Sequence, residues 1–148
     1  MPASYHRIIV PVNGSNGDAR VLALAADLVH RQQVAITLIY VVEVQQSMPL
    51  DAELPAEIDR GEAVLSRAEE LARSLISSKL DRLTTDLLQA RSAGAAIVDE
   101  AIERNADAIV MATTIRVKHG KTHLGETAAY VLKNAPCEVI VVRLAQPD

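Results

Sequence analysis

A segment rich in basic and hydroxyl side chains, Met111 to Thr127, lies in the C-terminal third of the chain. It runs from an apolar stretch into the start of a predicted helix and contains five basic residues: Arg116, Lys118, His119, Lys121 and His123. A helix start offers free backbone N–H groups and a positive dipole, so the segment suits a phosphate or another anion. Gly125 would let the backbone approach that ligand closely. The alternative is a solvated basic loop.

Other residues capable of chemistry are better explained by structure. His119 and His123 are four residues apart, as metal ligands on a helix can be, but Gly120 argues against a regular helix and no third ligand is evident. We therefore expect no metal. The acids between residues 51 and 62 favour a solvated loop and helix start over a catalytic cluster. Cys137, the single cysteine, is interpreted as a small core residue rather than a redox thiol. No nucleophile–base pair can be assigned.

Strand and helix patterns alternate along the whole chain. The predicted strands are 7–12, 34–44, 84–90, 107–112 and 138–142, and the predicted helices are 18–29, 59–78, 94–105 and 124–134. The segment 116–123 is expected to be a loop. This alternation predicts a single α/β domain over residues 1–148, in which helices cover both faces of a five-stranded parallel sheet.

The composition fits this fold and argues against several functions. The chain has 148 residues, 49% of them hydrophobic but only 2% aromatic, so its core must be aliphatic. Few aromatics remain to stack nucleic-acid bases, and a net charge of −4 disfavours DNA and anionic membrane surfaces. No apolar run reaches the roughly 18 residues of a membrane span, and no secretory signal is visible. We expect a cytoplasmic protein that binds neither nucleic acid nor membrane.

The predicted sheet also indicates where a ligand would bind. In open parallel sheets, ligands lie beyond the carboxyl ends of the strands, where the strand order reverses. Three segments fall there: 11–17, 42–46 and 112–125. The basic segment is among them, which favours the anion-binding interpretation. Any apolar part of such a ligand would have to lie between aliphatic side chains such as Val12, Val42 and Met111, because aromatic residues are few and strand alternation aims Tyr40 away.

Several of these segments resemble the universal stress protein family. The similar pieces are 8–15, with Asn13 where the family usually has Asp, and 39–43, 106–111 and 131–142. The resemblance covers almost the whole chain. It implies a three-layer, adenine nucleotide α-hydrolase-like sandwich with strand order 3-2-1-4-5. It also implies a homodimer joined through the last strand, Val139, Ile140, Val141 and Val142. Because an apolar edge strand needs cover, the sequence of that strand is consistent with such pairing.

The family's phosphate-binding signature is Gly, two residues, Gly, nine residues, Gly, then Ser or Thr. The corresponding residues here are Ala112, Ile115, Gly125 and Glu126, so the spacing agrees but only Gly125 matches. Ile115 disfavours a positive φ, and Glu126 places a carboxylate where a hydroxyl would contact phosphate. The resemblance therefore implies a member with an altered signature. The candidate ligands are ATP, AMP, a cyclic nucleotide or another anion.

The resemblance implies a regulatory module rather than an enzyme, with an adenine nucleotide or other anion in a modified pocket. The implied binding residues are Pro11, Val12, Asn13, Gly14, Ser15, Val41, Met111, Ala112, Thr113, Arg116, Lys118, Gly125, Glu126 and Thr127. An alternative is a dimeric stress-response module that binds no nucleotide and works by contacting protein partners. A third interpretation is a nucleotide-hydrolysing enzyme.

Overall fold

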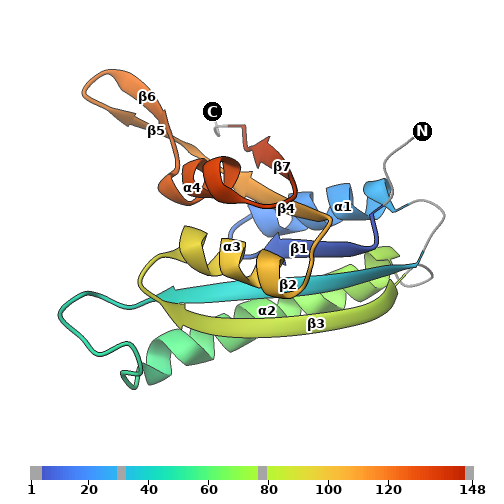
Figure 1. The fold of residues 1–148 in the computed structure, drawn as a ribbon, viewed down its shortest axis with the longest axis horizontal. Helices are drawn as coiled ribbons and strands as arrows, with labels where there is room; N and C mark the ends of the chain where they lie inside the picture. Colours follow the sequence, from blue (N-terminus) through green and yellow to red (C-terminus); the bar gives the residue numbers. More distant parts are fainter. Residues whose placement is uncertain (1–4, 30–32, 77–79, 146–148) are drawn as a thin grey trace.

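The computed structural model describes residues 5–29, 33–76 and 80–145, with backbone only at residues 80, 81, 116, 118, 122 and 123. Within them lies a five-stranded parallel sheet in the order β3-β2-β1-β4-β7 (Figure 1). The elements are β1 (Arg7–Pro11), α1 (Gly17–Leu28), β2 (Val34–Glu43), α2 (Pro55–Ile76), β3 (Leu80–Ala90), α3 (Ala93–Glu103), β4 (Ala108–Thr113), β5 (Ile115–Lys118), β6 (Lys121–Leu124), α4 (Glu126–Asn134) and β7 (Glu138–Arg143). The α/β class and the strand order 3-2-1-4-5 are confirmed, with β7 as the fifth strand of the sheet.

The two faces of the sheet carry separate aliphatic cores. Successive side chains of a strand point to opposite faces. Val10 in β1 therefore packs with α1 and α2, whereas its neighbour Ile9 packs with α3 and α4. Among the aromatic residues, Tyr5 is buried, and its hydroxyl donates to Glu138 Oε1 at 3.2 Å. The aliphatic core expected from the composition is the one the structure shows.

The central strand β1 joins the two halves of the sheet. It pairs with β2 as far as Pro11, opposite Ile39, but it pairs with β4 only at Ile8 and Ile9. The two strands therefore separate toward their carboxyl ends. The amino end of β1 is held by Asp107, whose Oδ2 accepts from the N–H groups of His6 at 2.6 Å and Arg7 at 2.7 Å. The opening between β1 and β4 is the topological switch point of this sheet.

The expected basic loop is a β-hairpin. β5 and β6 form a two-stranded antiparallel sheet that projects from the body of the molecule (Figure 1). His119 and Gly120 connect the strands with φ of 54° and 75°, the positive values that two-residue hairpin turns require. Leu124 consequently belongs to β6, so the prediction that a helix begins at Leu124 is wrong. α4 begins at Glu126.

Two other elements begin earlier in the chain than the sequence predicts. α2 begins at Pro55 rather than at Asp59, because proline suits the first turn of a helix, where its missing N–H costs nothing. The predicted end of this helix at Ser78 lies outside the described residues. β3 begins at Leu80 rather than at Thr84.

Among the described residues, no helix is both long enough and apolar enough to cross a membrane.

Candidate functional site

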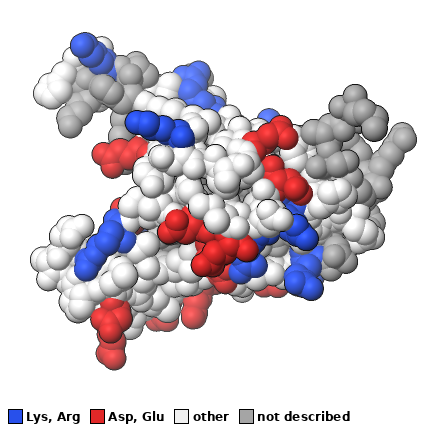
Figure 2. Space-filling model, viewed as in Figure 1, with Lys and Arg blue, Asp and Glu red and all other residues white. Residues whose placement is uncertain are grey.

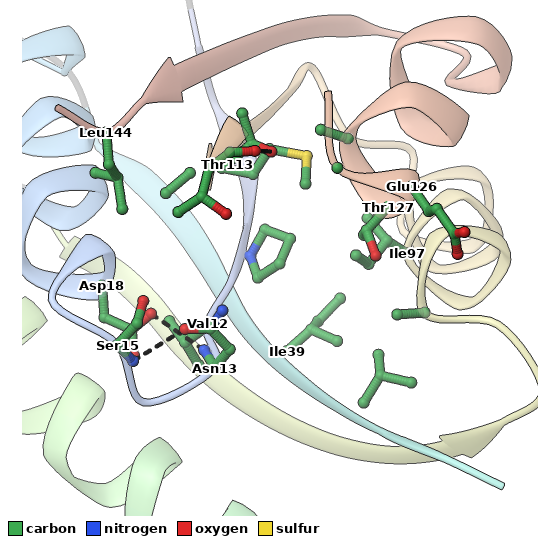
Figure 3. A pocket seen from close by; sticks show the side chains of 18 of the residues that line it. Val12, Asn13, Ser15, Asp18, Ile39, Ile97, Thr113, Glu126, Thr127 and Leu144 are labelled. Carbon is green, nitrogen blue, oxygen red and sulfur yellow. Dashed lines mark hydrogen bonds between the residues drawn. The ribbon is translucent and has the colours of Figure 1, made fainter. Parts of the chain in front are cut away.

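A pocket of about 360 Å³ opens at the carboxyl ends of β1, β2 and β4 (Figure 3). The residues that line it are Pro11, Val12, Asn13, Ser15, Asp18, Ile39, Val41, Glu43, Ala93, Ile97, Met111, Ala112, Thr113, Thr114, Gly125, Glu126, Thr127, Ala128 and Leu144. Its location is the switch point at which β1 and β4 separate. Ligand pockets commonly have volumes of about 300–1,000 Å³, so this one has room for a small organic molecule.

The pocket brings together most of the binding residues expected from the sequence. Those on its wall are Pro11, Val12, Asn13, Ser15, Val41, Met111, Ala112, Thr113, Gly125, Glu126 and Thr127. Gly14 is not among the lining residues; it lies in the loop between β1 and α1, with φ of 87°. Arg116 and Lys118 belong to β5, and the structure does not describe their side chains.

The expectation that Val42 lines the pocket is wrong. Ile39, Val41 and Glu43 share one face of β2 and line it, whereas Val42 has the opposite parity and is buried elsewhere. Alternation along the strand would have found Ile39 and Glu43. The same alternation correctly placed Tyr40 away from the pocket, against Gly61 of α2.

Other lining residues were not expected from the sequence, and Asp18 and Leu144 are two of them. Leu144 follows β7, and its N–H donates to the carbonyl of Thr113 at 2.9 Å, which holds the end of the chain across β4. A Cβ at Gly17 would come within 2.9 Å of Leu144 Cδ1 and of Ala112 Cβ, so these three residues pack closely. No local sequence signal links residues so far apart in the chain.

The carboxylate of Asp18 organises the loop between β1 and α1. Its Oδ1 accepts from the N–H of Asn13 at 3.1 Å and its Oδ2 from that of Gly14 at 2.7 Å. The Asn13 side chain turns back, so that its Oδ1 accepts from the N–H of Ser15 at 2.9 Å. Figure 3 shows the contacts of Asn13 with Asp18 and with Ser15 at one side of the pocket. Asp18 therefore supplies a negative charge to donors that a ligand could otherwise use.

Burial raises the pKa of Asp18 above its ordinary value. The hydrogen bonds from Asn13 and Gly14 and the positive charge of Arg67 act in the opposite direction, because they stabilise the carboxylate. The wall of the pocket carries two further acids, Glu43 and Glu126. None of the described lining residues is Lys, Arg or His. The charged side chains among the described lining residues are therefore all acidic.

The start of α4 forms the opposite side of the pocket. Gly125 is the N-cap residue of α4, and no side chain caps this end of the helix with a hydrogen bond. A Cβ at Gly125 would come within 3.0 Å of Thr113 Oγ1, so the backbone lies close to β4 there. In Figure 3 the Thr127 hydroxyl lies toward the pocket, whereas the Glu126 carboxylate extends outward, away from Asn13 and Thr113. The first turn thus offers backbone N–H groups and one hydroxyl.

A second, more open hollow of about 510 Å³ is lined by Leu50, Asp51, Ile58, Leu87 and Gln89. On the face drawn in Figure 2, acidic and basic side chains are interspersed, without a broad basic area of the kind that binds nucleic acid. Within the described part of the chain, no three His, Cys, Asp or Glu side chains lie close enough together to hold a metal ion.

Comparison with known proteins identifies the family of the chain. Residues 4–143 match the sequence profile described as the Universal stress protein family. The chain belongs to this family. A universal stress protein of Methanocaldococcus jannaschii is 29% identical over 145 residues, which cover 94% of this chain and 82% of that protein.

Solved structures of universal stress proteins have the same fold. One from Archaeoglobus fulgidus is 27% identical, with a TM-score of 0.69, over 93% of this chain and 98% of the other. A structure of the Archaeoglobus fulgidus protein in complex with dAMP is 24% identical, with a TM-score of 0.68, over 95% of this chain and 99% of the other. At this identity the second similarity establishes the fold alone.

Proposed function

We propose that this universal stress protein is a regulatory module that binds an adenine nucleotide in the pocket between β1, β2 and β4. The observation that carries the proposal is the position of the pocket. It lies at the switch point of the sheet, between the loop that starts α1 and the uncapped first turn of α4. A structure with the same fold has been solved in complex with dAMP.

The lining suits a purine held by shape and backbone rather than by stacking. Aliphatic side chains from β2, from β4 and from the residue after β1 line the pocket: Val12, Ile39, Val41 and Met111. The Thr127 hydroxyl faces the same space. It belongs to the first turn of α4, whose N–H groups have no side-chain cap and suit a phosphate group. No nucleophile paired with a base is found among the described lining residues, so we propose a binding role in place of catalysis.

The protein is also proposed to act as a homodimer through β7. Val139, Ile140, Val141 and Val142 are only half-buried at this edge of the sheet. Leu132 of the adjacent α4 is 50% exposed. Antiparallel pairing of β7 with a second copy would cover both the strand edge and this helix face.

Thermal unfolding and calorimetric titration with AMP, dAMP, cyclic AMP and ATP test the nucleotide proposal. A ligand that binds the folded state raises its stability, by about 2.7 kcal/mol at one hundred times Kd. We expect at least one adenine nucleotide to raise Tm in a saturable way and GMP to have a smaller effect. If none of these nucleotides changes Tm or gives heat of binding, the alternative is favoured: a module that acts through protein partners alone.

A steric variant links binding to this pocket. Val41→Trp adds a large side chain to the pocket wall at the end of β2 and should abolish nucleotide binding. Val117→Trp makes the same change on the hairpin, where the side chain is 68% exposed and does not line the pocket, and serves as the matched control. Equal binding by the two variants would place the ligand elsewhere.

A further inference from the structure

The loop that starts α1 already contains its own anion. The N–H groups of Asn13 and Gly14 both donate to the Asp18 carboxylate, at 3.1 Å and 2.7 Å. Successive backbone N–H groups in a loop can bind an anion such as a ligand's phosphate. Here the Asp18 carboxylate already accepts hydrogen bonds from both N–H groups. A phosphate placed beside them would therefore find its donors occupied and would be repelled by the negative charge of Asp18.

The other charged side chains on the pocket wall have the same sign. Glu43 stands at the end of β2 and Glu126 at the start of α4. In the part of the wall that the structure describes, no positive side chain offsets them. Arg67 of α2 acts on the Asp18 charge but is not part of the lining. Like charges repel more strongly in a partly enclosed site than in bulk water, because the effective dielectric constant is lower.

The basic side chains of the hairpin that the structure describes, His119 and Lys121, lie away from the pocket. Ile115 pairs with Leu124 at its base, and Lys118 pairs with Lys121 next to the turn. His119 and Lys121 are therefore about 10 Å farther out along the strands, at roughly 3.3 Å per residue. Both side chains are exposed. In Figure 1 the hairpin extends away from the sheet.

We infer that the pocket selects adenine ligands of low negative charge, a nucleoside or its monophosphate over the triphosphate, and that Asp18 is the principal residue imposing this selection. The inference rests on the proposed function. A carboxylate can accept about four hydrogen bonds, so after its two backbone donors Asp18 retains capacity for a sugar hydroxyl. The same group thus accepts a hydrogen bond from a neutral sugar and repels added phosphates.

Calorimetric titration of the full chain with adenosine, AMP and ATP, in low salt with EDTA, tests the selection. We expect adenosine and AMP to bind and ATP to bind at least about tenfold more weakly than AMP. Raising the salt concentration should narrow the gap between AMP and ATP, because salt screens the repulsion, and should leave adenosine affinity nearly unchanged.

Two variants test the residues responsible. Asp18→Asn removes the charge but also one of the acceptors that hold the loop, so its fold is checked by circular dichroism. Glu43→Gln removes a charge at an exposed lining position for which the structure shows no side-chain hydrogen bond among the described residues. Both should reduce the preference for AMP over ATP, Asp18→Asn more strongly. Glu103→Gln, at the opposite end of α3 from the lining residue Ala93, is the matched control and should leave the preference unchanged.

The possible outcomes separate this inference from the proposed function. If adenosine, AMP and ATP all fail to bind, the proposed function is wrong. If ATP binds as tightly as AMP in low salt, the proposed function stands and the charge selection is overturned. If ATP is disfavoured but Asp18→Asn, correctly folded, keeps the full preference, the assignment to Asp18 is overturned.

Discussion

The backbone of Gly61 in α2 lies directly against the ring of Tyr40 in β2. A Cβ at Gly61 would come within 2.7 Å of Tyr40 Cδ1, and equally close to Leu87 Cδ1 of β3. Tyr40 therefore fills the space between the sheet and its longest helix and does not reach the pocket on the other face. This contact sets how closely α2 can approach the sheet.

Gly61→Ala should destabilise the protein even though alanine is the better helix former. Alanine gains about 1 kcal/mol of helix propensity over glycine, but overpacking a close contact costs about 1–3 kcal/mol. We expect a net loss of roughly 1 kcal/mol in the free energy of unfolding, measured by urea denaturation. Ser66→Ala, at an exposed position of the same helix, is the control and should be neutral or slightly stabilising. Equal stability of Gly61→Ala and the native protein would contradict this contact.

The pH dependence of stability should report the burial of Asp18. Its pKa in the folded protein is raised from 3.8, so the folded state binds this proton more tightly than the unfolded state. The associated stability is fully present below the unfolded pKa and is lost as pH rises through the folded one. The stability of the native protein relative to Asp18→Asn should therefore fall as pH rises from about 4, then level off. Asp27→Asn, at an exposed position of α1, gives the reference. A difference that grows with pH would refute this prediction.

Charging the β7 edge should break the proposed dimer. Val141 is half-buried in the strand that a second copy would pair with, and lysine is a residue that discourages edge pairing. We expect Val141→Lys to sediment as a monomer. Because Val141 also packs against the core, the exposed Leu132→Glu provides a second variant with less risk to the fold. Val117→Lys on the hairpin is the control. Sedimentation of Val141→Lys as an intact dimer would argue against pairing through β7.

Cys137 should react slowly with thiol reagents. Burial, with smaller contributions from the negative charges of Asp107 and Glu138, raises its pKa above 9.0. The thiolate is the reactive form, and it is therefore scarce at neutral pH. Alkylation by iodoacetamide should be slower in the folded protein than in urea, as mass spectrometry would show. Faster alkylation of the folded protein would contradict the interpretation of Cys137 as a structural residue.

The alternation of strands and helices was predictable because a buried parallel strand has a distinctive sequence. Residues 36–39 are apolar or buried on both sides, as a strand covered by two helix layers requires. The hairpin was not predictable in the same way. Its strands carry basic residues in place of an apolar alternation, and its turn depends on His119 adopting a left-handed conformation that only a minority of residues adopt.

The candidate site was predictable in its location but not in its charge. The rule for open sheets selects the correct edge, since it depends only on strand order. The contribution of Asp18 depends on a loop that folds back on itself, so that the first residue of the predicted helix 18–29 reaches Asn13 and Gly14. The error at Val42 has a simpler cause. Val41, which the family resemblance indicates as a binding residue, lies on the pocket face of β2, and adjacent residues of a strand point to opposite faces. Val41 and Val42 therefore could not both line the pocket.

The central position of β1 has a consequence for how the protein is made. β1 leaves the ribosome well before its neighbour β4, which begins at Ala108, about 100 residues later. At translation rates of about 5–20 residues per second, one side of β1 waits roughly 5–20 s for its partner. The pocket waits longer still, because Val12 and Leu144 both line it. A nascent chain therefore cannot complete the wall of this pocket before Leu144 has been made.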